Sequence, residues 1–344
     1  MPRILVTGGA GFIGSNFVRH LLEQKGYRVR VLDKLTYAGN LGNFSPEMRR
    51  DPRFEFVRGD VCSRSTVESA MKRCDAVVNF VAETHIDRSI DDVRPFVQTD
   101  FVGTSVLLEE FRRRPCDRFV QISTCEVYGS ARRVPMAEDH PLEPQSPYAA
   151  TKAGADRLCA AYASTYRLPI TILRPFNQYG PNQYPEKAIP FFYTSARADR
   201  PLYVYGSGRN TRDWTHVADL CRLVQTVLEV DRRKVAGEVF NAGSGEEESA
   251  LDIARAVLRY LGKPASLIRH TNDRPGHVQR LVCDTFKTRV DLGWRPTIKF
   301  REGLEQTLRW YDEHPAWWQR ITRRRQYRDF YRRWYLGTLK AGPK

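Results

Sequence analysis

Thr7-Gly8-Gly9-Ala10-Gly11-Phe12-Ile13-Gly14 follows the short apolar run Arg3–Thr7 and opens a helical pattern. In such a strand–turn–helix unit the first glycine allows a tight turn, and a later one lets the backbone approach a pyrophosphate. The last glycine lets the helix pack closely on the strand, so that the helix N-terminus faces the phosphates. The residues that we expect to contact a dinucleotide here are Gly8, Gly11, Phe12, Ile13 and Gly14.

The type of dinucleotide is predicted from the end of the second expected strand. Asp33 stands there, at the distance from the glycine turn that is typical of a residue binding the adenosine ribose. A carboxylate at this place accepts from the 2′-hydroxyl and repels a 2′-phosphate, so we expect NAD rather than NADP, although the adjacent Lys34 weakens the preference. Asp60 and Val61, after the third strand, are expected to line the adenine pocket.

Apolar, β-rich runs alternate with helical patterns through the first half of the chain. The expected strands are Arg3–Thr7, Arg28–Leu32, Phe54–Val57, Ala76–Val81, Phe119–Ser123 and Ile170–Leu173, and the expected helices include Gly14–Gln24 and Val102–Arg113. This alternation predicts an α/β fold with a doubly wound parallel (Rossmann) sheet. We expect an NAD-binding domain over 1–178, a smaller α/β substrate lobe over 179–319 with chain crossings between the two, and a tail over 320–344.

Composition excludes several classes of protein. The chain has 344 residues and a net charge of +15, and no apolar run approaches the ~18 residues of a membrane span. Met1–Val6 runs directly into the first strand, which leaves no room for a signal peptide. The seven cysteines are scattered, without metal or redox spacing. We therefore expect a cytoplasmic protein without a metal site.

A candidate catalytic pair lies in Ser146-Pro147-Tyr148-Ala149-Ala150-Thr151-Lys152. Tyr148 and Lys152 are four residues apart and share one helix face. The lysine charge can lower the pKa of the phenol from its ordinary value of about 10. A phenolate can take a proton from a sugar hydroxyl while hydride leaves the same carbon. Glu126, within Ser123-Thr124-Cys125-Glu126-Val127-Tyr128-Gly129, supplies a second base.

Several spaced motifs together resemble a known family, the extended short-chain dehydrogenase/reductases that act on nucleotide sugars. Besides the glycine turn and the Tyr-Lys pair, Arg174-Pro175-Phe176-Asn177-x-Tyr179-Gly180-Pro181 is similar to that family. The likeness narrows to the dTDP-glucose 4,6-dehydratases. It rests on Ala82–Ser89, Pro185–Pro190, Arg212-Asp213-Trp214, Asp273–His277 and the run from Trp310-Tyr311 to Trp317-Trp318. The resemblance extends from residue 2 to about residue 320.

The resemblance implies a reaction cycle. Tyr148, helped by Lys152 and Thr124, removes the proton of the C4 hydroxyl while hydride passes to NAD. The 4-keto group acidifies C5, Glu126 removes the C5 proton, the C6 hydroxyl leaves, and hydride returns to C6. In the family an aspartic acid protonates the departing hydroxyl, and Cys125 stands at its position here.

The thiol at position 125 leaves more than one reaction open. Ordinary pKa values are about 8.5 for Cys and 3.9 for Asp, so a neutral thiol holds a proton but is the weaker acid. We expect 4,6-dehydration first. The alternatives are a 5,6-dehydratase that forms an exocyclic alkene, a nucleotide-uronic-acid decarboxylase and a 4-epimerase. A non-catalytic nucleotide-sugar sensor is a further alternative, although the intact Tyr148, Lys152 and Glu126 argue against it.

Further residues are expected to bind the substrate. By the resemblance, Asn177 and Lys187 hold the nucleotide diphosphate, and Arg212 clamps a phosphate oxygen. Arg274 and His277 are expected nearby, and His85 follows the fourth strand on the cleft side of the sheet. The resemblance also implies a homodimer, formed by helices near Val102–Arg113 and Ala149–Tyr162.

The tail is strongly basic, with nine Lys and Arg residues between Arg320 and Lys344 against one acidic residue. Its aromatic residues Tyr327, Phe330, Tyr331, Trp334 and Tyr335 fall at helical spacing and form a stripe. The simplest interpretation is a terminal helix that docks this stripe on the body or on a partner subunit. A peripheral contact with anionic lipid is a second hypothesis. Nucleic-acid binding is not expected, because no known module is recognisable.

Overall fold

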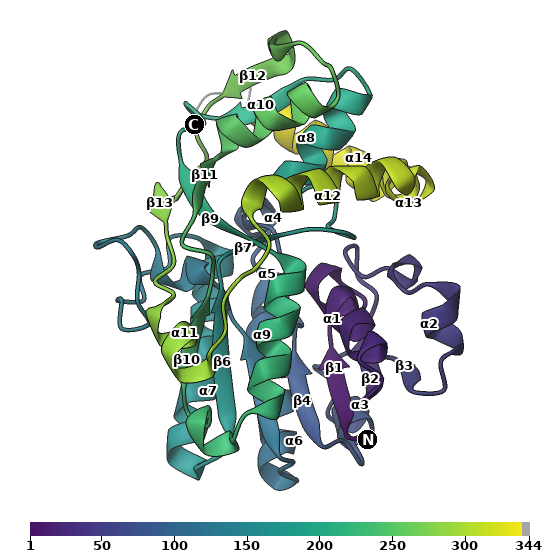
Figure 1. Cartoon of the computed structure of the whole chain (residues 1–344), viewed down its shortest axis with the longest axis vertical. Coiled ribbons are helices and arrows are strands. Elements are labelled where there is room, and N and C mark those ends of the chain that lie inside the picture. Colours follow the sequence, from purple (N-terminus) through teal and green to yellow (C-terminus); the bar gives the residue numbers. More distant parts are fainter. Residues whose placement is uncertain (339–344) are drawn as a thin grey trace.

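Seven parallel strands form the central sheet, in the order β10-β6-β5-β4-β1-β2-β3 (Figure 1). The computed structural model describes residues 1–338. The strands are β1 Arg3–Thr7, β2 Arg28–Asp33, β3 Phe54–Arg58, β4 Ala76–Asn79, β5 Arg118–Ile122, β6 Ile170–Pro175 and β10 Val239–Ala242. The central strands β4, β5 and β6 are buried along their whole length, as expected of a parallel sheet covered on both faces. The predicted α/β doubly wound fold is confirmed.

Helices cover both faces of this sheet. On one face α1 (Phe12–Glu23) packs on α9 (Val217–Glu229), and on the other α6 (Gly103–Arg113) lies between α3 (Arg64–Met71) and α7 (Pro147–Tyr166). Two apolar cores result, one containing side chains of α1 and α9 and one containing side chains of α3, α6 and α7. The shorter helices α2 (Pro46–Arg50) and α11 (Phe286–Leu292) lie near β3 and β10.

Most predicted elements differ from the structure by one or two residues at their ends, and two of these differences bear on the site. The fourth strand ends at Asn79 instead of Val81, at the point where Gly8 approaches the backbone of Phe80 and Val81. The helical course before Gly103 begins earlier than predicted, because α5 (Arg94–Phe96) continues through the π-helical turn η2 (Val97–Val102) into α6. π-Helical turns inside helices are frequent at functional sites.

A smaller cap lies over the carboxyl ends of the central strands (Figure 1). Its first sheet contains β7 Asn177–Tyr179, β9 Thr211–His216, β11 Glu247–Ser249 and β13 Arg280–Leu281, and its second pairs β8 Leu202–Tyr205 with β12 Ile268–Thr271. Its longer helices are α8 Ala188–Arg197, α10 Ala250–Tyr260 and α12 Phe300–Glu313. The chain crosses between the layers more than once, since α9 and β10 return to the central sheet between cap segments.

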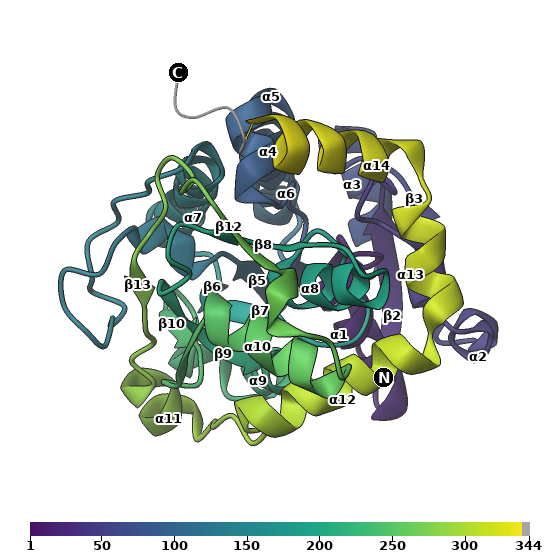
Figure 2. The same cartoon turned by 90° about the horizontal axis from the view of Figure 1, so that it is seen from above.

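The last helices, α13 (Pro315–Thr322), α14 (Arg325–Tyr331) and the π-helical η6 (Arg332–Thr338), follow the edge of the molecule (Figure 2). The aromatic stripe on α14 and η6 is buried against the cap, as the docking interpretation predicts: Tyr327, Phe330, Trp334 and Tyr335 are each at most 5% exposed. Within residues 1–338, no helix combines the length and the apolar character that crossing a membrane requires.

Candidate active site

A cavity of about 430 Å³ lies where the central sheet meets the cap. Open α/β sheets bind ligands at this edge, outside the carboxyl ends of the strands. Every site residue predicted from the sequence lines the cavity, and their individual roles remain predictions. These residues are Gly8, Gly11, Phe12, Ile13, Gly14, Asp33, Asp60, Val61, His85, Thr124, Cys125, Glu126, Tyr148, Lys152, Asn177, Lys187, Arg212, Arg274 and His277.

The glycine turn has the shape that a dinucleotide requires. Gly8 has a φ of +68°, and a Cβ there would lie 2.8 Å from the Phe80 backbone. A Cβ on Gly14 would lie 2.4 Å from the carbonyl oxygen of Gly8, so the helix packs on the turn only with glycine. Gly11 provides no side-chain cap, which leaves the first-turn N–H groups of α1 available to a phosphate. The turn therefore fits the pyrophosphate of NAD.

The residues around the expected ribose position also fit NAD. The Asp33 carboxylate accepts from the backbone N–H groups of Ala10 (3.0 Å) and Leu35 (2.8 Å), which orient it at the end of β2. Lys34, the nearby cation that weakened the sequence-based preference, is paired with Asp60 at 3.1 Å. The positive charge that weakened the sequence-based preference is thus largely compensated, and the preference for NAD is strengthened.

Tyr148 and Lys152 lie on α7 and both line the cavity, as their spacing predicts. The Lys152 ammonium donates to the carbonyl oxygen of Ile122 at 2.8 Å, and burial lowers its pKa. Burial raises the pKa of the Tyr148 phenol, and the Asp100 carboxylate raises it further. Desolvation therefore dominates the pKa of the phenol here, and the lowering of that pKa by the Lys152 charge remains a prediction.

Asp100 is a buried carboxylate behind the Tyr-Lys pair that the sequence analysis missed. It lies in the π-helical turn η2 and accepts from the Glu83 N–H at 2.8 Å and from the Thr151 hydroxyl at 3.2 Å. Burial raises its pKa to about 7, although the nearby Lys152 charge lowers it. Asp100 thus connects the loop after β4 to α7 and places a titratable group beside the lysine.

The Thr124-Cys125-Glu126 segment forms the start of a short 3₁₀ helix, η3 (Cys125–Tyr128), directly after β5. Thr124 caps this helix, because its hydroxyl oxygen accepts from the Glu126 N–H at 3.2 Å. The cap fixes the direction in which Glu126 leaves the backbone. A local turn therefore presents all three side chains to the cavity.

Cys125 lies between the cavity and an apolar cluster. Its side chain is 1% exposed and belongs to a group of buried residues that includes Val278, Leu281 and Cys283. Burial raises the pKa of its thiol well above the ordinary value, and the neighbouring Glu126 charge adds to this. The thiol therefore holds its proton at neutral pH, in surroundings that offer few polar partners.

Cationic side chains surround the Glu126 carboxylate. Burial lowers the pKa of Arg212 and opposes the rise in the pKa of Arg274, whereas the Glu126 charge raises both, which places all three within electrostatic reach. Lys187 belongs to the same set: its Nζ donates to the Thr84 hydroxyl at 3.0 Å, and burial lowers its pKa to about 8. This part of the cavity is suited to an anionic ligand.

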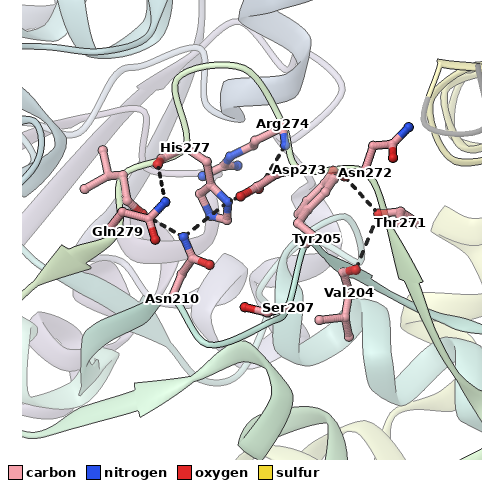
Figure 3. A network of polar contacts seen from close by, with 12 residues as sticks. Val204, Tyr205, Ser207, Asn210, Thr271, Asn272, Asp273, Arg274, His277 and Gln279 are labelled. Atoms are coloured by element: carbon pink, nitrogen blue, oxygen red, sulfur yellow. Dashed lines mark hydrogen bonds and ion pairs between the residues drawn. The ribbon is translucent and has the colours of Figure 1, made fainter. Parts of the chain in front are cut away.

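Two loops of the cap hold the polar wall at this end (Figure 3). His277 pairs with Asp273 at 2.5 Å and contacts the Asn210 amide at 3.5 Å. Burial lowers the pKa of His277 to about 4, with the Arg274 charge as the next cause. Arg212 donates to the carbonyl of Val278 at 2.6 Å, which ties β9 to the same loop. Three of the predicted substrate residues, Arg212, Arg274 and His277, are thus brought together.

His85 and Asp87 also line the cavity, next to Arg274. His85 has a φ of +115°, a strained backbone conformation for a non-glycine residue. Its Nε2 contacts the Glu186 carbonyl at 3.1 Å, whereas its buried Nδ1 has no hydrogen-bond partner among the described residues. Asp87 is 2% exposed and accepts from Tyr205 at 2.7 Å and from Arg274 at 3.3 Å. The His85 Nδ1 lies 3.8 Å from the Asp87 carboxylate, and a buried nitrogen without a hydrogen bond in a strained backbone is typical of a ligand site.

Comparisons with known proteins agree with this arrangement. A family model described as GDP-mannose 4,6 dehydratase matches residues 5–307. A dTDP-glucose 4,6-dehydratase of Streptomyces niveus is 46% identical over 324 residues, which is 92% of this chain and 95% of that protein. The crystal structure of DesIV, a dTDP-glucose 4,6-dehydratase from Streptomyces venezuelae with NAD bound, superposes with a TM-score of 0.89 at 43% identity, covering 93% of this chain and 99% of that one.

A second solved structure is also similar to this chain. It is a dTDP-glucose 4,6-dehydratase from Bacillus anthracis in complex with NAD, with a TM-score of 0.86 at 39% identity. It covers 93% of this chain, and all of its own chain is matched. Relatives of this similarity, matched over nearly their whole length, share the fold of this chain.

Proposed function

The chain belongs to the GDP-mannose 4,6 dehydratase family and is an NAD-dependent nucleotide-sugar dehydratase, and from this premise we propose its substrate and the roles of its residues. The substrate is dTDP-glucose, the sugar nucleotide named for its relatives. The observation that carries the proposal is the meeting of two separate motifs in one cavity. The glycine turn supports a dinucleotide there, and Tyr148, Lys152 and Glu126 line the same space.

Each predicted residue then has a task. NAD, when bound, supplies the acceptor for hydride and a positive charge that favours an anionic phenol. Tyr148 takes the proton of the C4 hydroxyl, and Lys152 balances the negative charge that develops. Glu126 takes the C5 proton, which the neighbouring C4 ketone has made acidic. Lys187 and Arg212 bind the diphosphate, and the cationic wall favours its negative charge.

Cys125 takes the place of the acid that protonates the departing C6 hydroxyl. The raised pKa of its thiol keeps the proton available at neutral pH, which is the first requirement of a general acid. Its apolar surroundings and weak donor character make it a slow one. The enzyme therefore performs 4,6-dehydration with a less effective acid than an aspartic acid.

The direct test is product identification. The purified protein is incubated with dTDP-glucose, other nucleotide hexoses and nucleotide uronic acids, and the products are identified by mass and NMR. Loss of one water to give a 4-keto-6-deoxy sugar supports the proposal. An exocyclic alkene without a ketone, loss of carbon dioxide, or inversion at C4 would replace it with 5,6-dehydration, decarboxylation or epimerisation. Absence of any turnover would leave a nucleotide-sugar sensor.

Cys125→Asp is expected to raise the rate of 4,6-dehydration by up to about 100-fold. Burial and the Glu126 charge act on any acid at this position, so a carboxyl there keeps its proton and is a stronger hydrogen-bond donor than the thiol. Steady-state assays of the 4-keto product measure the change. Cys125→Ala is the companion variant and is expected to lower the rate. If Ala matches the natural enzyme and Asp gives no gain, then Cys125 is a passive residue.

We also propose that the protein is a homodimer whose interface includes α7 and the segment before α6. Val97, Phe101 and Tyr166 are apolar or aromatic and at least 39% exposed there. Val97→Glu is expected to give a monomer in analytical ultracentrifugation. Val290→Glu, at a more exposed valine on α11, is the matched control and should leave the dimer intact. Dimers of unchanged stability with Val97→Glu would place the interface elsewhere.

Cytoplasmic location remains part of the proposal. All seven cysteines are free, which suits a reducing compartment. The hypothesis of membrane contact through the tail loses the apolar face on which it rested, because Phe330, Trp334 and Tyr335 are buried against the cap. Only the exposed arginines of α14 and η6 could then meet an anionic lipid surface. We therefore do not extend the proposal to membranes.

A further inference from the structure

The C-terminal helical segment, α14 with η6, forms part of the cavity wall. Tyr335 lines the cavity together with residues of α8 and β8. Figure 2 shows this segment running along the edge of the molecule to the vicinity of α4 (Ile86–Asp91). The family model ends at residue 307, so the segment lies outside the part of the chain that defines the family.

Aromatic stacking fixes Tyr335 at this wall. Its ring is stacked on Phe191 at 4.7 Å and 15°, and on Tyr203 at 5.6 Å and 9°. Phe191 and Tyr203 themselves line the cavity. Tyr335 of the tail therefore supports Phe191 and Tyr203 in the cavity wall, and its own side chain also lines the cavity.

A chain of hydrogen bonds leads from the tail to the polar end of the cavity. The Trp334 indole N–H donates to the Tyr205 hydroxyl oxygen at 2.8 Å. Tyr205 in turn donates to the Asp87 carboxylate at 2.7 Å, and Arg274 donates to the other oxygen of Asp87 at 3.3 Å. Tyr205, Asp87 and Arg274 all line the cavity. The indole N–H consequently decides which direction the Tyr205 hydroxyl points.

The tail is anchored on the same side by a second contact. Phe330 packs edge-on against the His85 ring at 5.5 Å and lies under the Arg88 guanidinium at 4.2 Å. The same guanidinium also lies over the Tyr37 ring, at 4.0 Å from its centroid. The strained loop that carries His85 is thus held by a residue of the C-terminal segment.

We propose that Trp334 and Tyr335 are positioning residues for the nucleotide-diphosphate part of the substrate. They hold Tyr205, and through it Asp87 and Arg274, in the orientation that receives an anionic ligand. The inference rests on the proposed function, because it assigns the wall to the nucleotide sugar. The proposal makes the substrate-binding wall dependent on residues of the C-terminal segment. The dinucleotide turn between β1 and α1 does not depend on that segment.

Trp334→Phe is the test variant, because it keeps an aromatic ring and removes only the indole donor. The probe is thymidine diphosphate, measured by isothermal titration calorimetry on the full chain. We expect binding about three- to tenfold weaker, the range that one hydrogen bond contributes. In turnover assays the KM for the nucleotide sugar should rise by a similar factor while kcat stays within about twofold and NAD affinity is unchanged.

Trp318→Phe is the matched control. Trp318 packs on the same apolar cluster, and its indole N–H donates to the Tyr311 carbonyl at 2.9 Å, away from the cavity. This variant loses one indole hydrogen bond as well, so its Tm should fall by a similar amount. Its affinity for thymidine diphosphate should be unchanged. Equal affinity losses in both variants would overturn the inference, because they would show a general loss of stability.

A double-mutant cycle tests whether Trp334 acts through Tyr205. If it does, adding Trp334→Phe to Tyr205→Phe has no further effect on thymidine diphosphate affinity. Additive losses would contradict the proposed route. The proposed function fails in a different way: the natural protein would then bind no nucleoside diphosphate at all. Should Trp334→Phe fold poorly, Tyr335→Leu, which removes the ring stacked on Phe191 and Tyr203, should show the same split between KM and kcat, and an unchanged KM there would overturn the inference.

Discussion

Tyr148→Phe is expected to lower kcat/KM by about 10²–10⁴-fold, the range that general acid–base catalysis supplies. The substitution removes the only atom of this side chain that can exchange a proton with the C4 hydroxyl. The Tyr148 side chain is half-buried and its phenol has a raised pKa, so its ionisation depends on charges brought into the cavity. Because C4 oxidation precedes every later step, its loss also prevents exchange of the C5 proton.

The measurement is product formation together with the exchange of C5–H in deuterated water. Tyr162→Phe is the matched control: it lies on the same helix, and its hydroxyl donates to Glu109 at 2.5 Å, outside the cavity. It should retain full activity. Tyr148→Phe with activity within tenfold of the natural enzyme would mean that another group takes the C4 proton.

Glu126→Gln is expected to lower dehydration by about 10²–10⁴-fold while leaving the C4 oxidation possible. Glutamine keeps the size of the side chain and cannot accept the C5 proton. Tyr148 and Lys152 remain, so the first proton transfer is unaffected. Substrate should therefore stop at the 4-keto stage, with the cofactor reduced and without C5 exchange.

The absorbance of the reduced cofactor separates this variant from Tyr148→Phe, which should show none, whereas C5 exchange should be lost in both. Glu248→Gln is the control, because Glu248 lines the same cavity from β11. It should retain C5 exchange. Normal exchange in Glu126→Gln would assign the C5 proton to a different base and would reopen the epimerase alternative.

The sequence predicted the parts of the site that depend on local geometry. A turn with Gly8 and Gly14 needs glycine because backbone atoms approach within a few ångströms of each missing Cβ, and this requirement is visible in the sequence itself. The same holds for Tyr148 and Lys152, since a separation of four residues fixes a common helix face. These predictions concern segments shorter than two helical turns.

Other features of the site depended on partners far away in the chain. The pKa of Tyr148 rises because of burial and because Asp100 comes from another helix. The charge of Lys34 is compensated by Asp60, and the sequence pattern around these residues does not predict their ion pair. Electrostatic effects are set by distance and by exclusion of water, neither of which is encoded in the spacing of residues along the chain.

The basic tail shows most clearly which features follow from the sequence and which follow from the tertiary structure. By itself, the sequence determined a helical aromatic stripe with arginines around it, because helical periodicity is a local property. Which surface covers the stripe was decided only by the tertiary structure, which brings Phe191 and Tyr203 to Tyr335, and Tyr205 to Trp334. An apolar face is buried by whatever complementary surface the fold places beside it. Here that surface belongs to the wall of the active site.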